Sequence, residues 1–254
     1  MYKHEKRIKV TVTVLCEIFT VFTIGMLFKN GEPDRLALSF ATLLLAALPM
    51  LAEKYLCCRI NLSVYLFALA YAIGPMLGHC WKLYYTVPVW DKLLHISGGV
   101  MFAILGAYFF ELLIRGEKHH GAKVIFALCF SMAIAVLWEF CEFCADTFLG
   151  MDMQDDTVIH SLTSYLLGER LGVTGSIQDI CAVTVNGIAL PGYIDIGLID
   201  SMLDMLLETL GAAVTCMLLW LDRGKHPLIR DERFAQHRRD SQAGKERAKW
   251  QKDM

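Results

Sequence analysis

The sequence has few charged residues and almost no net charge. Asp, Glu, Lys and Arg make up 20% of its 254 residues, and their formal sum is −2 at pH 7. Soluble domains typically carry about 25% charged residues. The composition argues against intrinsic disorder, a collagen-like chain and a nucleic-acid-binding domain. Hydrophobic residues instead reach 56%, with a mean hydropathy of +0.45, which is typical of a membrane protein.

Signals of a secreted, disulfide-bonded protein are also missing. The nine cysteines are odd in number and mostly lie in apolar runs, so we expect no disulfide framework. Cys141 and Cys144 form a CxxC pair on a predicted helix, but no second pair accompanies them, which disfavours a thiol or zinc role. The first apolar run contains Glu17 and no small-residue cleavage site, so we expect no cleavable signal peptide.

Six apolar runs are long enough to cross a bilayer, which takes about 20 residues with a range of roughly 17–25. They cover approximately residues 8–28, 36–52, 62–81, 92–114, 124–148 and 201–221. The sequence therefore predicts an all-α polytopic membrane protein. Its six transmembrane helices lie in residues 1–221, and residues 222–254 form a separate basic tail.

The distribution of Lys and Arg predicts the orientation of these helices. With the N-terminus in the cytoplasm, 19 of the 24 basic residues fall on the cytoplasmic side. The other side receives only five, namely Lys29, Arg35, Lys82, Lys92 and Arg170. Cytoplasmic flanks are enriched in Lys and Arg. We therefore expect both termini, and the basic tail, to be cytoplasmic.

The connection between the fifth and sixth helices, residues 149–200, is expected to be a structured outer loop. Residues 156–167 carry apolar side chains at roughly helical spacing, which favours a short helix at the membrane interface. Residues 177–196 are divided by Asn186-Gly187, a typical hairpin turn. An irregular cap over the helix ends is the alternative.

Three predicted helices each carry a stripe of ionisable residues, although such residues are costly inside a membrane. Spacings of three, four, seven or eight residues place the members of each stripe on one helix face. The stripes are Asp91 and His95 on the fourth helix, Glu139, Glu142 and Asp146 on the fifth, and Asp200, Asp204 and Glu208 on the sixth. Asp91 and Asp200 also stand near helix starts, where each can act as an N-cap.

The three stripes lie at matching depth. The fourth and sixth helices run inward and the fifth outward, so all three stripes occupy the outer half of the membrane. At about 1.5 Å per residue, His95 lies ~6 Å below Asp91 and Glu208 ~12 Å below Asp200. We therefore expect the stripes to form one cluster. Small residues at Gly98-Gly99 and Gly211 favour close helix contact beside it.

The expected cluster has an excess of negative charge. Only one or two histidines and Lys92 lie nearby, and Lys92 is expected to point to the membrane interface. The acids must then share protons or hold a transported cation, bind a divalent metal ion, or form a polar network between helices. Carboxylates with an imidazole suit Mg²⁺, Mn²⁺, Fe²⁺ or Zn²⁺. The candidate metal ligands are Asp91, His95, Glu139, Glu142, Asp146, Asp200, Asp204 and Glu208.

Several of these segments together resemble a known family. They are Asp-Lys-Leu-Leu-His at 91–95, Trp-Glu-Phe-Cys-Glu at 138–142, Gln-Asp-Asp at 154–156, and residues 200–211. Over roughly residues 62–215 the sequence is similar to the uncharacterised bacterial inner-membrane family that includes YjdF, and more distantly to the VanZ-like family. The resemblance implies a multi-pass protein of the bacterial cytoplasmic membrane, and it implies no reaction.

Three functions remain open on the sequence. The leading hypothesis is an outward-facing metal site that hydrolyses or modifies a lipid or lipid-linked envelope precursor. Its ligands or general bases would be His95, Glu142, Asp204 and Glu208, with Glu139 and Asp146 in support. The alternatives are a cation- or proton-coupled transporter and an envelope-assembly or structural subunit. The expected partner is the lipid bilayer, and we do not expect binding to nucleic acid.

Overall fold

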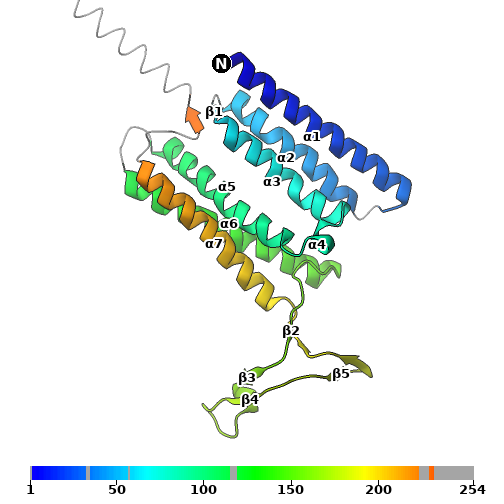
Figure 1. The fold of residues 1–254 in the computed structure, drawn as a ribbon. Helices are drawn as coiled ribbons and strands as arrows, with labels where there is room; N and C mark the ends of the chain where they lie inside the picture. Colours follow the sequence, from blue (N-terminus) through cyan, green and yellow to red (C-terminus); the bar gives the residue numbers. More distant parts are fainter. Residues whose placement is uncertain (1, 33–34, 57, 115–118, 223–228, 232–254) are drawn as a thin grey trace, which may run out of the picture.

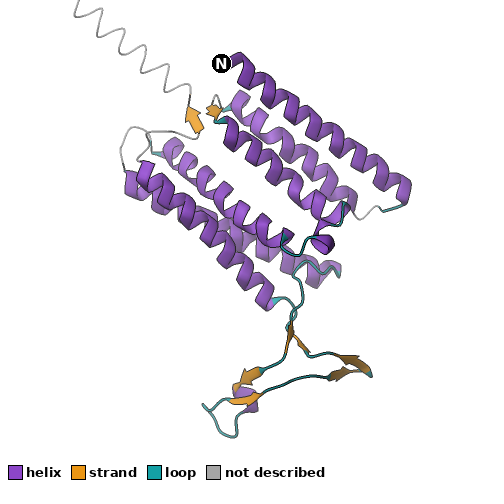
Figure 2. Cartoon of the chain, in the orientation of Figure 1, coloured by secondary structure: helices purple, strands orange, loops and turns teal. Residues whose placement is uncertain are grey.

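A computed structural model describes residues 2–32, 35–56, 58–114, 119–222 and 229–231. The chain is mostly helical (Figure 2). Within the described residues, six helices are long and apolar enough to cross a membrane. They are α1 (Tyr2–Asn30), α2 (Leu36–Tyr55), α3 (Leu62–Cys80), α5 (Trp90–Leu113), α6 (His120–Leu149) and α7 (Leu198–Asp222). A single-turn helix, α4 (Leu83–Thr86), precedes α5. All six predicted spans are confirmed, and each lies within or close to the bounds of one helix.

The helices form two groups of three (Figure 1). Helices α1, α2 and α3 contact one another, as do α5, α6 and α7, and α3 packs against α5 to join the groups. One core cluster joins the two groups, since Tyr65 of α3 packs there with Tyr108 of α5. A second cluster, which includes Ala103 and Ala127, lies within the group of α5, α6 and α7. The three helices with the predicted acidic stripes therefore form one group.

The surface of the bundle is apolar, and several of its buried residues are polar. Leu44 and Phe22 are largely exposed, whereas Thr20, Thr42 and Ser39 are almost fully buried. The buried hydroxyls donate to carbonyls four residues earlier in their own helices. Apolar side chains outside and satisfied polar groups inside are the arrangement that a hydrocarbon solvent favours.

Residues 150–197 form an arm at one end of the bundle (Figure 1). Its base is the pair β2 (Val158–Ile159) and β7 (Tyr193–Ile194), and two branches leave this base. One branch pairs β3 (Leu162–Ser164) with β4 (Gly175–Ile177), and the other pairs β5 (Val183–Val185) with β6 (Ile188–Leu190). We call the end of the bundle beside it the arm end.

One of the two predictions for this loop is confirmed. Strands β5 and β6 form the expected hairpin, with Asn186 and Gly187 both at positive φ in the turn. The expected interfacial helix over 156–167 is wrong, because that segment forms β2, β3 and the 3-10 helix η2 (Tyr165–Leu167). Its apolar spacing misleads because β2 and β3 pair with distant segments, which a local pattern does not contain.

The opposite end of the bundle has its own polar network. Lys9 of α1 is buried and lies 2.5 Å from both Glu53 Oε1 and the Ile60 carbonyl oxygen. Ile60 belongs to β1 (Cys58–Ile60), which pairs antiparallel with β8 (Ile229–Asp231). Apart from Asp222 and β8, the predicted tail lies outside the described residues.

Candidate functional site

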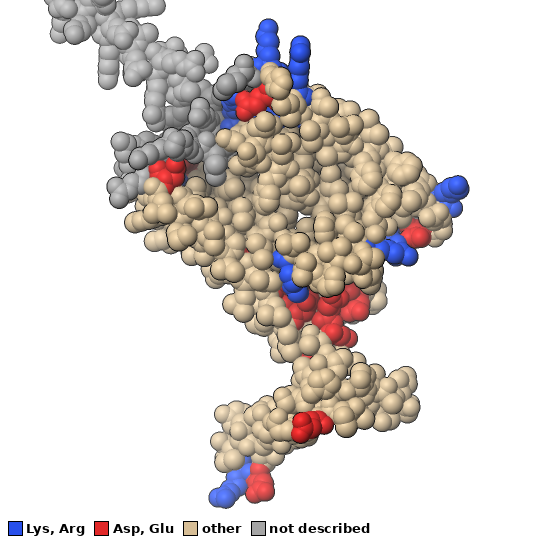
Figure 3. Space-filling view, viewed as in Figure 1, with Lys and Arg blue, Asp and Glu red and all other residues tan. Residues whose placement is uncertain are grey.

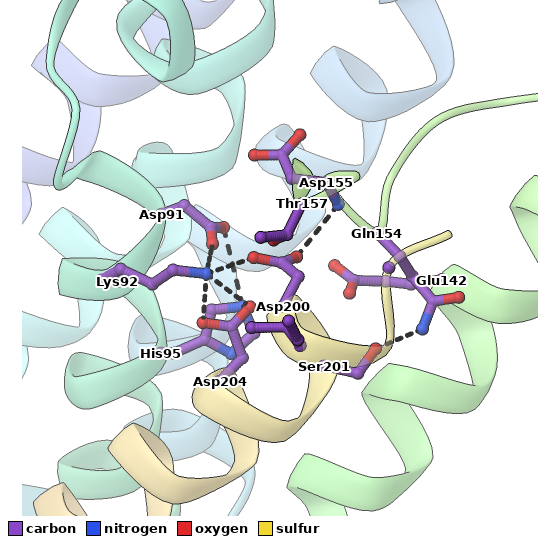
Figure 4. Close-up of polar contacts among 12 residues, drawn as sticks. Asp91, Lys92, His95, Glu142, Gln154, Asp155, Thr157, Asp200, Ser201 and Asp204 are labelled. Atoms are coloured by element: carbon purple, nitrogen blue, oxygen red, sulfur yellow. Dashed lines mark hydrogen bonds and ion pairs between the residues drawn. The ribbon is translucent and has the colours of Figure 1, made fainter. Parts of the chain in front are cut away.

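Acidic residues gather where the bundle meets the arm (Figure 3). Helix α5 brings Asp91, Lys92 and His95 to this region, and α7 brings Asp200, Asp204 and Glu208. Their contacts, described next, join the two stripes into what we call the acidic cluster (Figure 4). The predicted meeting of the α5 and α7 stripes therefore occurs.

Lys92 lies at the centre of the acidic cluster. Its Nζ atom is 3.0 Å from Asp91 Oδ2, 2.5 Å from Asp200 Oδ1 and 2.8 Å from Asp204 Oδ1. The expectation that Lys92 points to the interface is wrong. Its four-carbon stem lets the ammonium reach three carboxylates, which neutralises part of their charge. A protein cation therefore supplies part of the positive charge that we expected from protons or a bound metal ion.

His95 faces the same carboxylates from one turn further along α5. Its Nε2 atom lies 3.6 Å from Asp91 Oδ1 and from Asp204 Oδ2, and its Nδ1 atom lies 3.8 Å from Glu208 Oε2. Both His95 and Asp204 are buried. Asp91, His95 and Asp204 can each offer one ligand atom, and these three atoms lie within 4.8 Å of one another. This triad is the arrangement in the described residues that can hold a metal ion.

Helix α6 contributes two buried carboxylates beside the cluster. Glu139 lies next to Ser201 of α7. Glu142 accepts a hydrogen bond of 2.8 Å from the Trp138 indole, and its carboxyl group points toward the α7 residues (Figure 4). Neither belongs to the triad. Both can reach a group bound beside it, and they are therefore candidates for a supporting role.

Two buried carboxylate oxygens near the cluster lack a hydrogen-bond partner among the described residues. They are Glu139 Oε2 and Glu208 Oε1. The side chains are well buried, with 6% and 4% of their surface exposed. A buried polar atom left unpaired costs about 1–3 kcal/mol. The described chain alone therefore leaves two acceptors unsatisfied at the arm end.

Asp146, the last predicted member of the α6 stripe, has a different position from the others. Its carboxylate accepts hydrogen bonds from the backbone N–H groups of Met153, at 2.6 Å, and Gln154, at 2.9 Å. It therefore fixes the first turn of the arm after α6. The structure does not bring Asp146 into the triad, because its oxygens are directed at these amides.

The arm covers the cluster through its first residues. The Asp155 N–H donates to Asp200 Oδ2 at 3.0 Å, and the Gln154 amide donates to the Ser201 hydroxyl. Partial burial of Asp155, together with the carboxylates of Asp200 and Asp91, raises the pKa of Asp155 above its usual value. The arm thus adds an acidic group with a raised proton affinity at the rim of the site.

Asp195 is a site residue that the sequence argument missed. Its carboxylate accepts from the N–H groups of Thr157, Gly197 and Ile199, and so joins the arm to the first turn of α7. It acts as the cap of this helix, in place of the suggested Asp200. Asp91 is not the N-cap of α5 either, since that position is Val89. The sequence did contain a signal for this role, because an Asp shortly before an apolar run, here that of α7, is typical of a helix start.

The floor of the cluster is closed by direct backbone contact between α5 and α7. A Cβ atom added to Gly99 would lie 2.0 Å from the Glu208 carbonyl oxygen, and one added to Gly211 would lie 2.3 Å from the Ile96 carbonyl oxygen. The predicted close contact at these glycines is therefore confirmed. The Ser131 hydroxyl of α6 also donates to the Gly99 carbonyl at 3.2 Å, which closes the third side.

The sequence matches one family model, that of a predicted membrane protein family, DUF2238, over residues 11–225. The chain belongs to the DUF2238 family. This result confirms the resemblance to the YjdF family. The matched range of DUF2238 includes most of α1, the other five spanning helices, the arm and the whole acidic cluster. No curated protein and no solved structure matches the sequence significantly. DUF2238 membership therefore identifies a membrane protein and brings no reaction with it.

Proposed function

We propose that this protein binds a divalent metal ion at Asp91, His95 and Asp204. The observation that carries the proposal is the convergence of three potential ligand atoms within 4.8 Å, from two helices. Two carboxylates and an imidazole suit Mg²⁺, Mn²⁺, Fe²⁺ or Zn²⁺. His95 and Asp204 are buried, which favours a built site over a chance surface cluster of acids.

Lys92 is the resting counter-ion of this proposed site. An ammonium and a metal ion are alternative cations for the same carboxylates, since Lys92 contacts Asp91 and Asp204. The Lys92 side chain is 30% exposed, so it has a route out of the cluster. On metal binding the ammonium would leave Asp91 and Asp204 and stay near Asp200, its 2.5 Å partner.

The substrate we propose is a lipid or a lipid-linked envelope precursor, which would be hydrolysed or modified. The site lies at the end of spanning helices, where the head group of a membrane lipid is the nearest substrate. A bound metal ion lowers the pKa of its water and so supplies a nucleophile at neutral pH. Glu142 and Glu208 are the proposed general bases that accept the proton. Glu139 would orient the water through its unpaired oxygen.

The closed floor of the cluster favours this function over cation- or proton-coupled transport. A transporter needs a pathway to both ends of the bundle. Directly below His95 and Glu208 the α5 and α7 backbones touch at Gly99 and Gly211, which leaves no space for an ion between these two helices. A cluster that lies at one end of the bundle above this close helix contact suits an enzyme that acts on one membrane face.

We also propose the placement of the chain in its membrane. The concentration of Lys and Arg away from the arm end favours cytoplasmic termini and an arm on the outer face of the bacterial cytoplasmic membrane. The division into a six-helix domain over residues 1–221 and a basic cytoplasmic tail is part of the same proposal. Protease cleavage of the tail from the cytoplasmic side alone would support this orientation.

Elemental analysis of detergent-purified protein tests the metal site. After incubation with Mg²⁺, Mn²⁺, Fe²⁺ or Zn²⁺, we expect the wild type to retain one equivalent of a divalent ion. Asp204→Asn and His95→Ala should reduce the affinity by more than the roughly 10–100-fold typical of outer-shell substitutions. Glu111→Gln is a matched control, because Glu111 pairs with Lys123 far from the cluster. A wild type that retains no ion, or variants that bind as it does, would refute the proposal.

The lipid substrate has a separate test. The metal-loaded protein is incubated with extracted bacterial lipids, and the lipids are then compared by mass spectrometry with those treated with Glu142→Gln. We expect a mass change only with the wild type. Identical lipid profiles, together with a bound metal ion, would exclude a lipid substrate and leave the metal site standing.

A further inference from the structure

The β3–β4 branch of the arm ends in an unusually apolar loop. We call residues 165–173 the tip loop. Its side chains Leu166 and Leu171 are 95% and 105% exposed, and Tyr165 and Val173 are exposed as well. Large apolar side chains clustered on a projecting loop usually mark a contact surface. The arm itself contains nothing that covers them.

The tip loop is held in a compact shape that keeps these side chains outside. A Cβ atom at Gly168 would lie 1.8 Å from the Val173 carbonyl oxygen, and one at Gly175 would lie 2.1 Å from the Leu167 carbonyl oxygen. The backbone therefore folds tightly on itself. The Ser164 hydroxyl caps the 3-10 turn by accepting from the Leu166 N–H. Leu166 and Leu171 project from a preformed loop and not from a loose coil.

The direction of the branch carries the tip loop sideways, beyond the end of α7 (Figure 1). In Figure 1 the β3–β4 branch turns sideways past the end of α7, whereas β5–β6 points away from the bundle. A branch that runs across the helix axes at the arm end lies parallel to the membrane that these helices span. A lipid leaflet that surrounds the arm end of α7 would therefore extend toward the tip loop.

Exposed apolar residues also follow the lipid-facing side of α7 up to the base of the arm. Leu206, Met202 and Leu198 follow one another along α7 and are 65%, 49% and 62% exposed. Ile196, immediately before the helix, is 82% exposed. At the same end, Tyr85 of α4 is exposed, as interfacial aromatic residues are. Apolar exposure thus continues from the hydrocarbon-facing helix to the base of the arm.

The chemistry of the tip loop fits a phospholipid head-group region. Tyr165 offers an apolar ring with a hydroxyl, and Arg170, between the two exposed leucines, offers a cation for lipid phosphate. The loop has few internal backbone hydrogen bonds, so its depth is limited to the interface, where water still satisfies the peptide groups.

We propose that the tip loop inserts Leu166 and Leu171 into the head-group region of the leaflet at the arm end. The arm then lies on the membrane as a second anchor beside the bundle. Its first residues cover the acidic cluster through the contacts of Asp155 and Gln154 with α7. Anchoring the tip fixes the arm at both ends and holds this cover at the level of the lipid head groups.

Site-specific photo-crosslinking of the full chain tests this proposal. Leu166→p-benzoylphenylalanine and Leu171→p-benzoylphenylalanine variants are placed in nanodiscs of phosphatidylethanolamine and phosphatidylglycerol, irradiated and analysed by intact-protein mass spectrometry. We expect phospholipid adducts at both positions. The same residue at Leu206 on α7 is the positive control, and at Thr184 on the β5–β6 branch it is the negative control.

The outcomes separate the lipid from other partners. Lipid adducts at 166, 171 and 206, but not at 184, would support the proposal. Adducts between two copies of the chain at 166 or 171, or no lipid adduct there while 206 gives one, would overturn it. Because the tip loop makes no contact with the cluster among the described residues, this result is independent of whether the site binds metal.

Discussion

Replacing Lys92 is the sharpest test of the acidic cluster, because one ammonium serves three carboxylates. The Lys92→Met substitution keeps the length of the side chain and removes its charge. Breaking a buried ion pair costs about 3–5 kcal/mol, whereas exposed pairs contribute roughly 0–1 kcal/mol. The Lys92 side chain is 30% exposed, but its partner Asp204 is only 1% exposed. We therefore expect a loss of about 2–3 kcal/mol in the free energy of unfolding.

A divalent ion should reverse this loss if the cluster is a metal site. An ion at 100 times its dissociation constant stabilises the folded state by about 2.7 kcal/mol. In Lys92→Met the ion meets three carboxylates without a competing ammonium. The rescue should therefore be larger, and should need less metal, than in the wild type, where the ion must first displace Lys92.

Equilibrium unfolding in mixed micelles, with and without Mn²⁺ or Zn²⁺, measures both effects. Lys29→Met is the matched control, since Lys29 is an exposed lysine in the last turn of α1. It should change neither the stability nor the response to metal. A Lys92→Met protein as stable as the wild type would refute the counter-ion role. Equal metal responses of the two proteins would refute competition between Lys92 and the ion.

Three further substitutions test the packing, the cap and the opposite network. Gly99→Ala should cost about 1–3 kcal/mol or more through overpacking, while Gly25→Ala, with nothing within 4 Å, should not destabilise, as thermal unfolding in detergent will show. Desolvation acts to raise the pKa of Asp195, but backbone hydrogen bonds from residues 199, 157 and 197 hold it below its usual value. The stabilisation by Asp195 is thus complete above the usual pKa of Asp and is lost as the pH falls through the lowered pKa. Hydrogen exchange at the start of α7 should therefore show a loss of protection in this pH range in the wild type and not in Asp195→Asn. Lys9→Met should cost about 3–5 kcal/mol in the same unfolding assay, because it leaves the Glu53 carboxylate without its cation, and Lys9→Arg should recover part of this loss.

The helices could be predicted from the sequence because their signal is local. An apolar run of about 20 residues has one stable conformation in a bilayer, so composition and length determine both the number and the bounds of the spans. The meeting of the α5 and α7 stripes was predictable for the same reason. His95, Asp204 and Glu208 have fixed heights along their helices, and topology sets the direction of each helix.

The position of Lys92 could not be predicted from the same reasoning. Residues follow one another by about 100° around a helix, so Lys92 starts only about 60° from His95. Helical spacing predicts the direction of the Cα–Cβ bond, but it does not predict where the ammonium group of a long, flexible side chain lies. The strands of the arm were missed for a different reason. β2 pairs with β7 across more than thirty residues of chain, and no local period contains such a pairing.

The two ends of the bundle offer a comparison within one molecule. Both bury charged groups, and at the end away from the arm these groups satisfy one another. Lys9 contacts Glu53, the Ile60 carbonyl and the face of Tyr65, and the Ile60 N–H donates back to Glu53. Such a network needs no further partner, so we interpret it as structural.

At the arm end, by contrast, the buried polar groups do not all satisfy one another. Lys92 is shared among three carboxylates, while Glu208 Oε1 and Glu139 Oε2 have no hydrogen-bond partner among the described residues. The buried charges are therefore satisfied at one end of the bundle, whereas two buried acceptors in the described part of the chain lack a hydrogen-bond donor at the other. Since unsatisfied buried acceptors cost stability, their retention beside a triad of potential ligands favours a site completed by a bound group.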